Sequence, residues 1–181
     1  MGNNVLEEIQ KIYSDVSEWV KFLEAKHAGL FAFWTALLIA VITSDVFAQM
    51  KIFWQLIVLV PIFIGSIINL ISFIPFMNRL KWMRKKCYKK YSGLTRNAVF
   101  YCSVFVNTYS EEGDIDKSVE KYCKILKEYF VQDIEGKLSM DYMKQIIEVS
   151  TVATIKAYLF GCATIYIFGV SLIAVALLMI A

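Results

Sequence analysis

The last 25 residues of the sequence, Ala157 to Ala181, contain no charged side chain. A helix rises about 1.5 Å per residue, so this segment is longer than the ~30 Å hydrocarbon core of a bilayer. The segment before it, Met140 to Lys156, has a helical pattern and contains no glycine or proline. We therefore expect one continuous helix that begins in a polar compartment and then crosses the membrane.

Two further apolar segments complete the expected membrane part. Ala28 to Thr43 is short for a span but is extended by Ser44 to Ala48, and Ile52 to Met77 is apolar almost throughout. Pro61 removes a backbone hydrogen bond and predicts a kink or a broken turn in the second span. Because only eight residues, Ser44 to Lys51, connect the two spans, they are expected to form an antiparallel hairpin. The sequence therefore predicts an all-α integral membrane protein with three transmembrane helices and a cytosolic helical layer.

The distribution of basic residues predicts the orientation of the spans. Of 19 lysines and arginines, Lys51 is the only one between residues 28 and 77, and the other 18 lie in residues 1–27 and 78–156. Since basic residues flank the cytosolic ends of membrane spans, the N-terminus is expected in the cytosol. The expected domains are an N-terminal amphipathic cytosolic helix (1–27), a transmembrane hairpin (28–77), a cytosolic helical region with a basic juxtamembrane segment (78–156) and a C-terminal transmembrane helix (157–181).

Residues 1–27 are expected to form an amphipathic helix rather than a signal peptide, because Glu7 and Glu8 lie where a signal peptide is basic or apolar. Apolar residues recur there at intervals of four and three, which places them in one stripe along a helix. The partner of this stripe is either the protein's own cytosolic helices or a neighbouring subunit, and the sequence leaves both open. The stripe consists of Val5, Ile9, Ile12, Val16, Trp19 and Leu23.

The central region is expected to form a small helical bundle. The apolar run Ala98 to Val106 is too short to span a membrane and is interpreted as its buried start. Asp114 is a candidate N-cap for a helix from Ile115 to Phe130. Gly136 is expected to break the chain, after which Ser139 caps the long final helix. The expected buried stripe of the Ile115 to Phe130 helix consists of Ile115, Val119, Tyr122, Leu126 and either Tyr129 or Phe130.

The segment from Arg79 to Arg96 contains eight basic residues and no acidic one, with Trp82, Tyr88 and Tyr91 between them. One interpretation is a cationic collar on anionic lipid headgroups. The other is a site for a phosphate-bearing ligand whose base stacks on an aromatic ring. The two interpretations are compatible. The candidate ligand-binding residues in this segment are Arg84, Lys85, Lys89 and Arg96.

Uncharged polar residues lie within the expected spans, where they either join helices by packing and hydrogen bonds or line a pore assembled from several copies. No acidic or basic residue lies in the middle of a span, which argues against an ion-coupled transporter. The candidate pore-lining residues are Gln55, Ser66, Asn69, Thr164 and Ser171.

The sequence contains no catalytic motif, so an enzyme is not expected. Four cysteines lack the spacing of a metal site or a disulfide framework, and His27 is the only histidine. We therefore expect free thiols, no metal and no cofactor, and His27 is interpreted as an interfacial side chain.

Three short motifs flank the spans: Glu24-Ala25-Lys26 before the first span, Gln145 to Ser150 (QIIEVS), and Lys156 at the entry to the last span. These motifs and the order of the segments resemble the transmembrane effectors of Pycsar-type and related nucleotide-signalled bacterial anti-phage systems. In that family an Ala-Asp-x-Lys-like motif precedes the first span, and Glu24 stands here where Asp is more usual. The resemblance adds Lys26, Gln145 and Lys156 to the candidate ligand-binding residues, beside Ser150.

The resemblance implies a homo-oligomeric effector in the bacterial inner membrane that responds to a nucleotide or oligonucleotide from a partner nucleotidyltransferase or cyclase. It would then form a pore or disrupt the lipid bilayer, which depolarises the cell and arrests growth. Readout of duplex DNA is not expected. The alternative function is a non-conducting membrane scaffold that recruits a cytosolic partner through the stripe from Val5 to Leu23.

Overall fold

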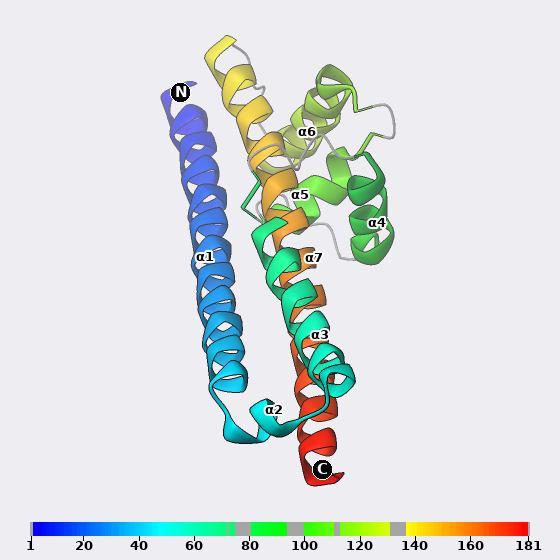
Figure 1. The fold of residues 1–181 in the computed structure, drawn as a ribbon. Coiled ribbons are helices and arrows are strands. Elements are labelled where there is room, and N and C mark those ends of the chain that lie inside the picture. Colours follow the sequence, from blue (N-terminus) through cyan, green and yellow to red (C-terminus); the bar gives the residue numbers. More distant parts are fainter. Residues whose placement is uncertain are drawn as a thin grey trace. The chain divides into compact units, whose positions relative to one another are not determined.

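The computed structural model describes residues 2–71, 73–74, 81–93, 100–110, 113–130 and 137–180. Within these ranges every regular element is an α-helix. The chain divides into unit 1, Met1–Leu23 with Phe76–Ala157, and unit 2, Glu24–Pro75 with Tyr158–Ala181. Helices α1 (Gly2–Ile42) and α7 (Lys137–Ile180) each contribute to both units (Figure 1). The predicted all-α architecture is confirmed, and so is a final helix that continues without a break from a polar into an apolar sequence.

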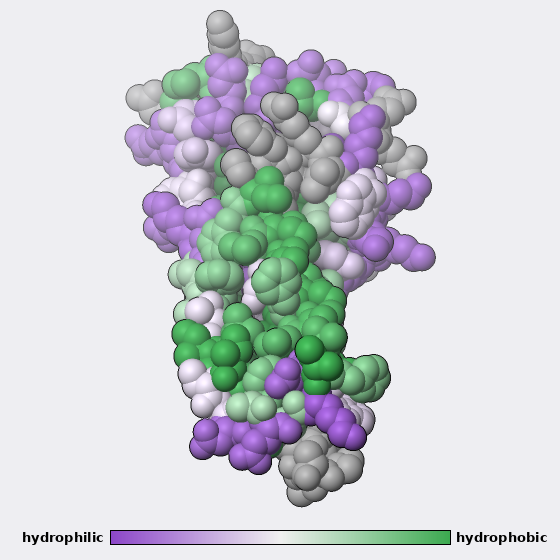
Figure 2. Space-filling view, in the orientation of Figure 1, coloured by the Kyte–Doolittle hydropathy of each residue, from purple (hydrophilic) through white to green (hydrophobic). Residues whose placement is uncertain are grey.

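Unit 2 holds the membrane part of the protein. It contains the second part of α1, the short α2 (Asp45–Gln49), α3 (Ile52–Ile71) and the last part of α7. Three helices in the described residues are long and apolar enough to cross a membrane: α1, α3 and α7. Figure 2 shows a largely hydrophobic surface over these helices, with hydrophilic residues gathered at the α2 turn. The chain is therefore a membrane protein, as predicted.

Aromatic residues hold the helices of unit 2 together. Trp34 of α1 is fully buried in a small core with Ile62 and Ile167, and its ring centroid lies 6.1 Å from that of Tyr166 on α7. The Tyr166 hydroxyl donates a hydrogen bond of 3.1 Å to the backbone carbonyl of Pro61. Helix α3 remains helical through Pro61, so a broken turn is not observed there. The three spans therefore meet at one aromatic contact.

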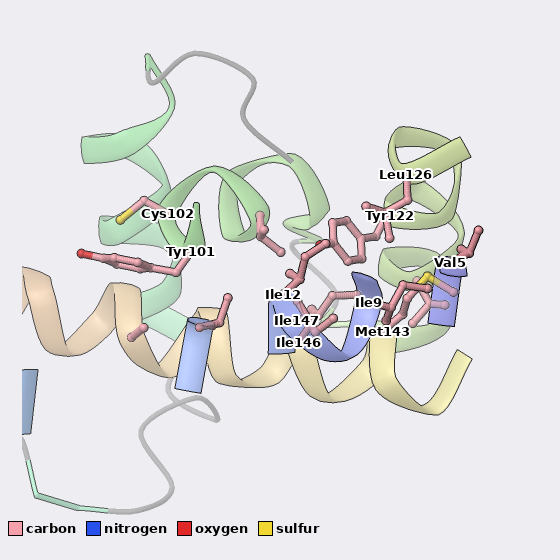
Figure 3. Packing of buried hydrophobic residues seen from close by; sticks show 14 of the residues in the cluster. Val5, Ile9, Ile12, Tyr101, Cys102, Tyr122, Leu126, Met143, Ile146 and Ile147 are labelled. Atoms are coloured by element: carbon pink, nitrogen blue, oxygen red, sulfur yellow. The ribbon is translucent and has the colours of Figure 1, made fainter. Parts of the chain in front are cut away.

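Unit 1 is a helical bundle built from the first part of α1, α4 (Lys81–Tyr91), α5 (Tyr101–Thr108), α6 (Ile115–Phe130) and the first part of α7. Figure 3 shows side chains from α1, α5, α6 and α7 converging in its core. The α1 stripe packs in this core, except for Trp19, which is 40% exposed. The partner of the stripe is therefore the protein's own bundle. The buried stripe residues are Val5, Ile9, Ile12, Val16 and Leu23.

Two local predictions for unit 1 are confirmed. Helix α6 runs from Ile115 to Phe130, and the Asp114 carboxylate accepts hydrogen bonds from the backbone N–H groups of Asp116 (3.0 Å) and Lys117 (3.3 Å). Such bonds satisfy donors that a helix N-terminus leaves free. Helix α5 is buried along most of its length, as expected for the apolar run with which it overlaps.

The predicted start of the last helix is wrong. Helix α7 begins at Lys137, so Ser139 lies inside its first turn rather than at the N-cap. Lysine and leucine are favourable helix residues, and Lys137 and Leu138 extend the helix beyond the expected cap. The predicted break at Gly136 lies outside the described residues. Helix α3 ends at Ile71. The described residues also leave out residue 72 and residues 75–80 of the chain that follows.

The contact between α1 and α3 requires a glycine. A Cβ atom at Gly65 would lie 2.7 Å from Trp34 Cε2, which real Cβ atoms do not reach. We expect Gly65→Ala to destabilise the folded protein by about 1 to 3 kcal/mol, because overpacking forces the helices apart. The measurement is the thermal unfolding midpoint of the full chain in detergent.

Gly29→Ala is the matched control, because nothing lies within 4 Å of a Cβ at Gly29. This variant should unfold at or slightly above the wild-type temperature, since alanine favours a helix over glycine. Equal midpoints for the two variants would contradict the close contact.

Candidate functional site

Helix α4 carries six basic residues in eleven positions and no acidic one. Its face with Met83 and Cys87 is buried in unit 1, while Lys85 and Lys89 are exposed. Arg84 lies between these faces and is half-buried. The helix therefore presents its basic side chains in two different environments.

Arg84 lies against a pair of stacked tyrosines. The rings of Tyr88 and Tyr109 are nearly parallel, with an interplanar angle of 14° and centroids 4.3 Å apart. The Arg84 guanidinium carbon lies 5.7 Å from the centroid of the Tyr109 ring. Phe105 meets the same ring edge-on at 5.7 Å. A cation and several π faces are thus brought together between α4 and the end of α5.

The segment after α5 supports this arrangement. Gly113 has a φ of 77°, a backbone conformation that favours glycine. A Cβ there would lie 3.0 Å from Arg84 Nη1, so the backbone approaches the guanidinium closely. Lys121 of α6 donates a hydrogen bond of 3.3 Å to the Tyr109 carbonyl. A second cation is therefore joined to the same tyrosine through its backbone.

This Arg84–Tyr109 site, defined by Arg84, Tyr88, Tyr109 and Lys121, has the groups that hold a phosphate and stack with a base. Arg84 Nε is buried and has no hydrogen-bond partner among the described residues. Tyr88 remains 37% exposed. Of the predicted ligand residues on this segment, Arg84 lies at the site, Lys85 and Lys89 lie on the outward face of α4, and Arg96 lies outside the described residues.

The family-pattern residues of α7 occupy different environments. Gln145 is exposed, Ser150 is fully buried, and Lys156 is only 5% exposed. The Ser150 hydroxyl has no hydrogen-bond partner among the described residues, whereas Thr154 donates to the Ser150 carbonyl at 2.8 Å. Lys156 is thus one of several buried polar residues on this stretch of α7, with Ser150, Thr151 and Thr154.

A buried cysteine borders this stretch of α7. Burial raises the pKa of the Cys102 thiol above its ordinary value, and hydrogen bonds with Thr154 and Tyr101 lower it only in part. A reactive cysteine requires the thiolate, which this environment disfavours at neutral pH. Cys102 is therefore suited to packing rather than to nucleophilic chemistry.

Lys26 and His27 lie next to each other on α1 in unit 2, but in contrasting environments. Lys26 is exposed, with its amine 5.5 Å from the centroid of the Phe160 ring. His27 is 1% exposed and lies edge-on to the same ring at 5.5 Å and to Phe73 at 6.3 Å. The interfacial side chain expected at position 27 is thus a core residue of unit 2.

The polar residues of the spans bond mainly to their own helices. Ser66 donates to the Ile62 carbonyl at 3.2 Å, and Thr164 donates to the Phe160 carbonyl at 2.8 Å. The buried Asn69 donates to the Gly65 carbonyl at 3.2 Å, while Gln55 donates to the Phe47 carbonyl at 2.9 Å across the hairpin turn. The side chain of Ser171 is outside the described part of the chain. The role of these residues in a pore remains a prediction.

Sequence reasoning missed Tyr109 and Lys121, which the fold brings to Arg84. Tyr109 follows α5 in the loop before Gly113, where the sequence shows only turn residues. The available signal was the glycine, since a loop glycine often marks a close backbone approach. Nothing in the sequence links Tyr109 to Tyr88.

The tyrosine stack predicts a stability effect. Tyr109→Leu removes the aromatic pair with Tyr88 and the cation–π contact with Arg84, so we expect the free energy of unfolding to fall by about 1 to 2 kcal/mol. Tyr109→Phe should retain most of this stability. Chemical denaturation of the full chain in detergent measures both.

Tyr129→Leu is the control, because Tyr129 is 59% exposed and, among the aromatic rings that the structure describes, its ring pairs with Phe130. An effect of Tyr129→Leu as large as that of Tyr109→Leu would show that the stack contributes nothing specific.

Comparison with known proteins agrees with the membrane architecture. The model of the Pycsar effector protein domain, PycTM, matches residues 8–181, which is nearly the whole chain. No curated protein and no solved structure matches the sequence. The chain therefore belongs to the Pycsar effector family and carries a membrane-embedded defence effector domain.

Proposed function

We propose that this protein is a non-enzymatic effector of anti-phage defence whose membrane helices are controlled by a nucleotide signal. Unit 1 binds the nucleotide, which a partner cyclase or nucleotidyltransferase produces. Several copies then form a pore or disrupt the inner membrane, which depolarises the cell and arrests growth. Membership of the Pycsar effector family supports the defence role and the cyclic nucleotide signal.

The observation that carries the proposal is that α1 and α7 belong to both units. A ligand changes a conformational equilibrium only if it binds two states with different affinities. Any change that shifts α1 or α7 within unit 1 acts on helices whose remaining turns lie in unit 2. The free energy of nucleotide binding to unit 1 can thereby change the arrangement of the membrane spans.

The Arg84–Tyr109 site is our proposed nucleotide contact. A guanidinium forms charge-assisted hydrogen bonds with phosphate, and an aromatic ring stacks with a base of any sequence. Lys85 and Lys89 flank the site on α4, and Arg96 follows in the chain. The family pattern adds Lys26, Gln145 and Lys156 as further candidates.

The proposed conducting state is a homo-oligomer, because three helices cannot enclose a wide aqueous path. Large apolar side chains on the outer faces of unit 2, such as Phe33, Phe63 and Ile165, are exposed and suit contact with lipid or with other copies. The excess of basic residues in unit 1 supports a cytosolic location for that unit and for the N-terminus. The proposed pore-lining residues remain Gln55, Ser66, Asn69, Thr164 and Ser171.

The scaffold alternative loses its docking surface. It relied on the α1 stripe, but five of its six residues are buried against the protein's own bundle. Trp19 alone remains partly exposed, with its ring 6.0 Å from that of Phe100. A partner protein would therefore need a different surface.

The first test concerns the nucleotide contact. The full chain is reconstituted in liposomes that hold a potential-sensitive dye, and cyclic mononucleotides and cyclic dinucleotides are added separately. A nucleotide that depolarises wild-type liposomes should act on Arg84→Gln only at about 10- to 100-fold higher concentration, because a charge-assisted hydrogen bond is lost.

Lys124→Gln is its control, since Lys124 is an exposed lysine of α6 away from Arg84. This variant should respond as the wild type does. If Arg84→Gln responded at the same nucleotide concentration as the wild type, the Arg84–Tyr109 site would be removed from the proposal. If none of the nucleotides depolarised the wild-type liposomes, control by a nucleotide would be removed.

The second test concerns the membrane path. We expect Asn69→Leu to lower ion leakage from liposomes in the activated state, because it replaces a polar amide by an apolar group of similar size. Potassium leakage is measured with a fluorescent potassium indicator. The thermal unfolding of the variant is measured in parallel. Unchanged leakage in a folded variant would assign Asn69 to helix packing alone.

A further inference from the structure

The outward face of α4 combines lysines with one large aromatic ring. Trp82 is 57% exposed, and the lysines nearest to it on the helix surface are exposed as well. The Lys86 amine lies 5.3 Å from the centroid of the Trp82 ring. The opposite face is anchored in unit 1 by Met83 and Cys87, which are 3% and 0% exposed. The residues of this outward α4 face are Lys81, Trp82, Lys85, Lys86 and Lys89.

We propose that the outward α4 face binds the surface of an anionic lipid bilayer. The lysine amines contact headgroup phosphates, and the Trp82 indole inserts at the level of the headgroups. Tryptophan and lysine are the residues that favour this interface, because each joins an apolar part to a polar end. The proposal does not depend on whether the protein responds to a nucleotide.

The positive charge of α4 is complementary to an anionic lipid surface. Helix α4 has six basic residues and no acidic one, so no carboxylate within the helix neutralises the outward face. Clusters of basic residues beside a membrane span attract anionic lipids, and the attraction accumulates with each residue. A bilayer surface offers many phosphates over a wide area, which suits side chains spread along three turns of helix.

The connection between α3 and α4 is short. Helix α3 ends at Ile71 and α4 begins at Lys81, so nine residues, 72–80, connect a membrane helix to the outward α4 face. Even a fully extended connection of that length reaches only about 35 Å. In the sequence these lysines are therefore juxtamembrane, the position at which clusters of basic residues attract anionic lipids.

The environment of Trp82 favours lipid over a soluble nucleotide on this face. The Lys86 amine lies over the indole ring, so a cation and an apolar ring share one exposed face, as they do at a headgroup layer. The tyrosine stack and Arg84, our proposed nucleotide contact, lie on another side of α4. The two sides of α4 thus suit two kinds of phosphate-bearing partner.

The test uses the full chain in vesicles and the emission of Trp82 itself. Vesicles of phosphatidylcholine brominated on its acyl chains are prepared with and without phosphatidylglycerol, and the emission of Trp82→Phe is subtracted from that of the wild type. We expect most of the Trp82 emission to be lost in vesicles that contain phosphatidylglycerol and retained in phosphatidylcholine alone. About 1 M salt should restore it, since the Debye length falls to about 3 Å.

Two triple variants separate the outward α4 face from general charge. Lys85→Gln, Lys86→Gln and Lys89→Gln together should abolish the loss of emission in phosphatidylglycerol vesicles. Lys11→Gln, Lys124→Gln and Lys127→Gln together remove the same charge from other exposed positions of unit 1 and should leave it unchanged. Circular dichroism checks that both variants are folded.

Three results would overturn the proposal. These are equal Trp82 emission in the two kinds of vesicle, equal behaviour of the two triple variants, or quenching that persists at high salt. Protection of Trp82 from a water-soluble quencher by a cyclic nucleotide in phosphatidylcholine alone would instead assign the face to a soluble ligand. The Arg84→Gln test of nucleotide control is independent of all these outcomes.

Discussion

The hydrocarbon core of a bilayer contains no water that could hydrogen-bond to the backbone. Every backbone N–H and C=O group in a span must find its partner within the protein, so the apolar segments form unbroken helices. Polar side chains obey the same rule. Ser66 and Thr164 donate to carbonyls one turn earlier in their own helices, and Asn69 does the same from a fully buried position. Polarity inside unit 2 is therefore compatible with tight helix packing.

Because lipid gives helices no hydrophobic reason to associate, their contacts depend on shape and on hydrogen bonds. In unit 2 the contact is made by a large ring against a residue with no side chain, Trp34 on Gly65. The Tyr166 hydroxyl adds a bond to the Pro61 carbonyl, beside a proline that supplies no backbone N–H to the helix. Few residues thus hold three long helices in register.

In unit 1 the basic helix α4 has one face in the core and another face that is exposed. The turn of α4 that brings Met83 and Cys87 into the core also turns Arg84 toward Tyr109 and leaves Lys85, Lys86 and Lys89 outside. We therefore propose a different face of α4 for each of the two interpretations of the basic segment, the lipid collar and the phosphate site.

Hydrophobic length, periodicity and capping act over a few neighbouring residues, so the spans, the α1 stripe and the Asp114 cap could be predicted before the fold was known. The helices that cover the α1 stripe, the buried face of α4 and the stacking of Tyr109 on Tyr88 became evident in the folded protein alone. These features join residues distant in the chain, and their geometry depends on the whole path of the backbone. The start of α7 was missed because the prediction places its N-cap at Ser139, whereas Lys137 and Leu138, both favourable helix residues, precede it within the helix.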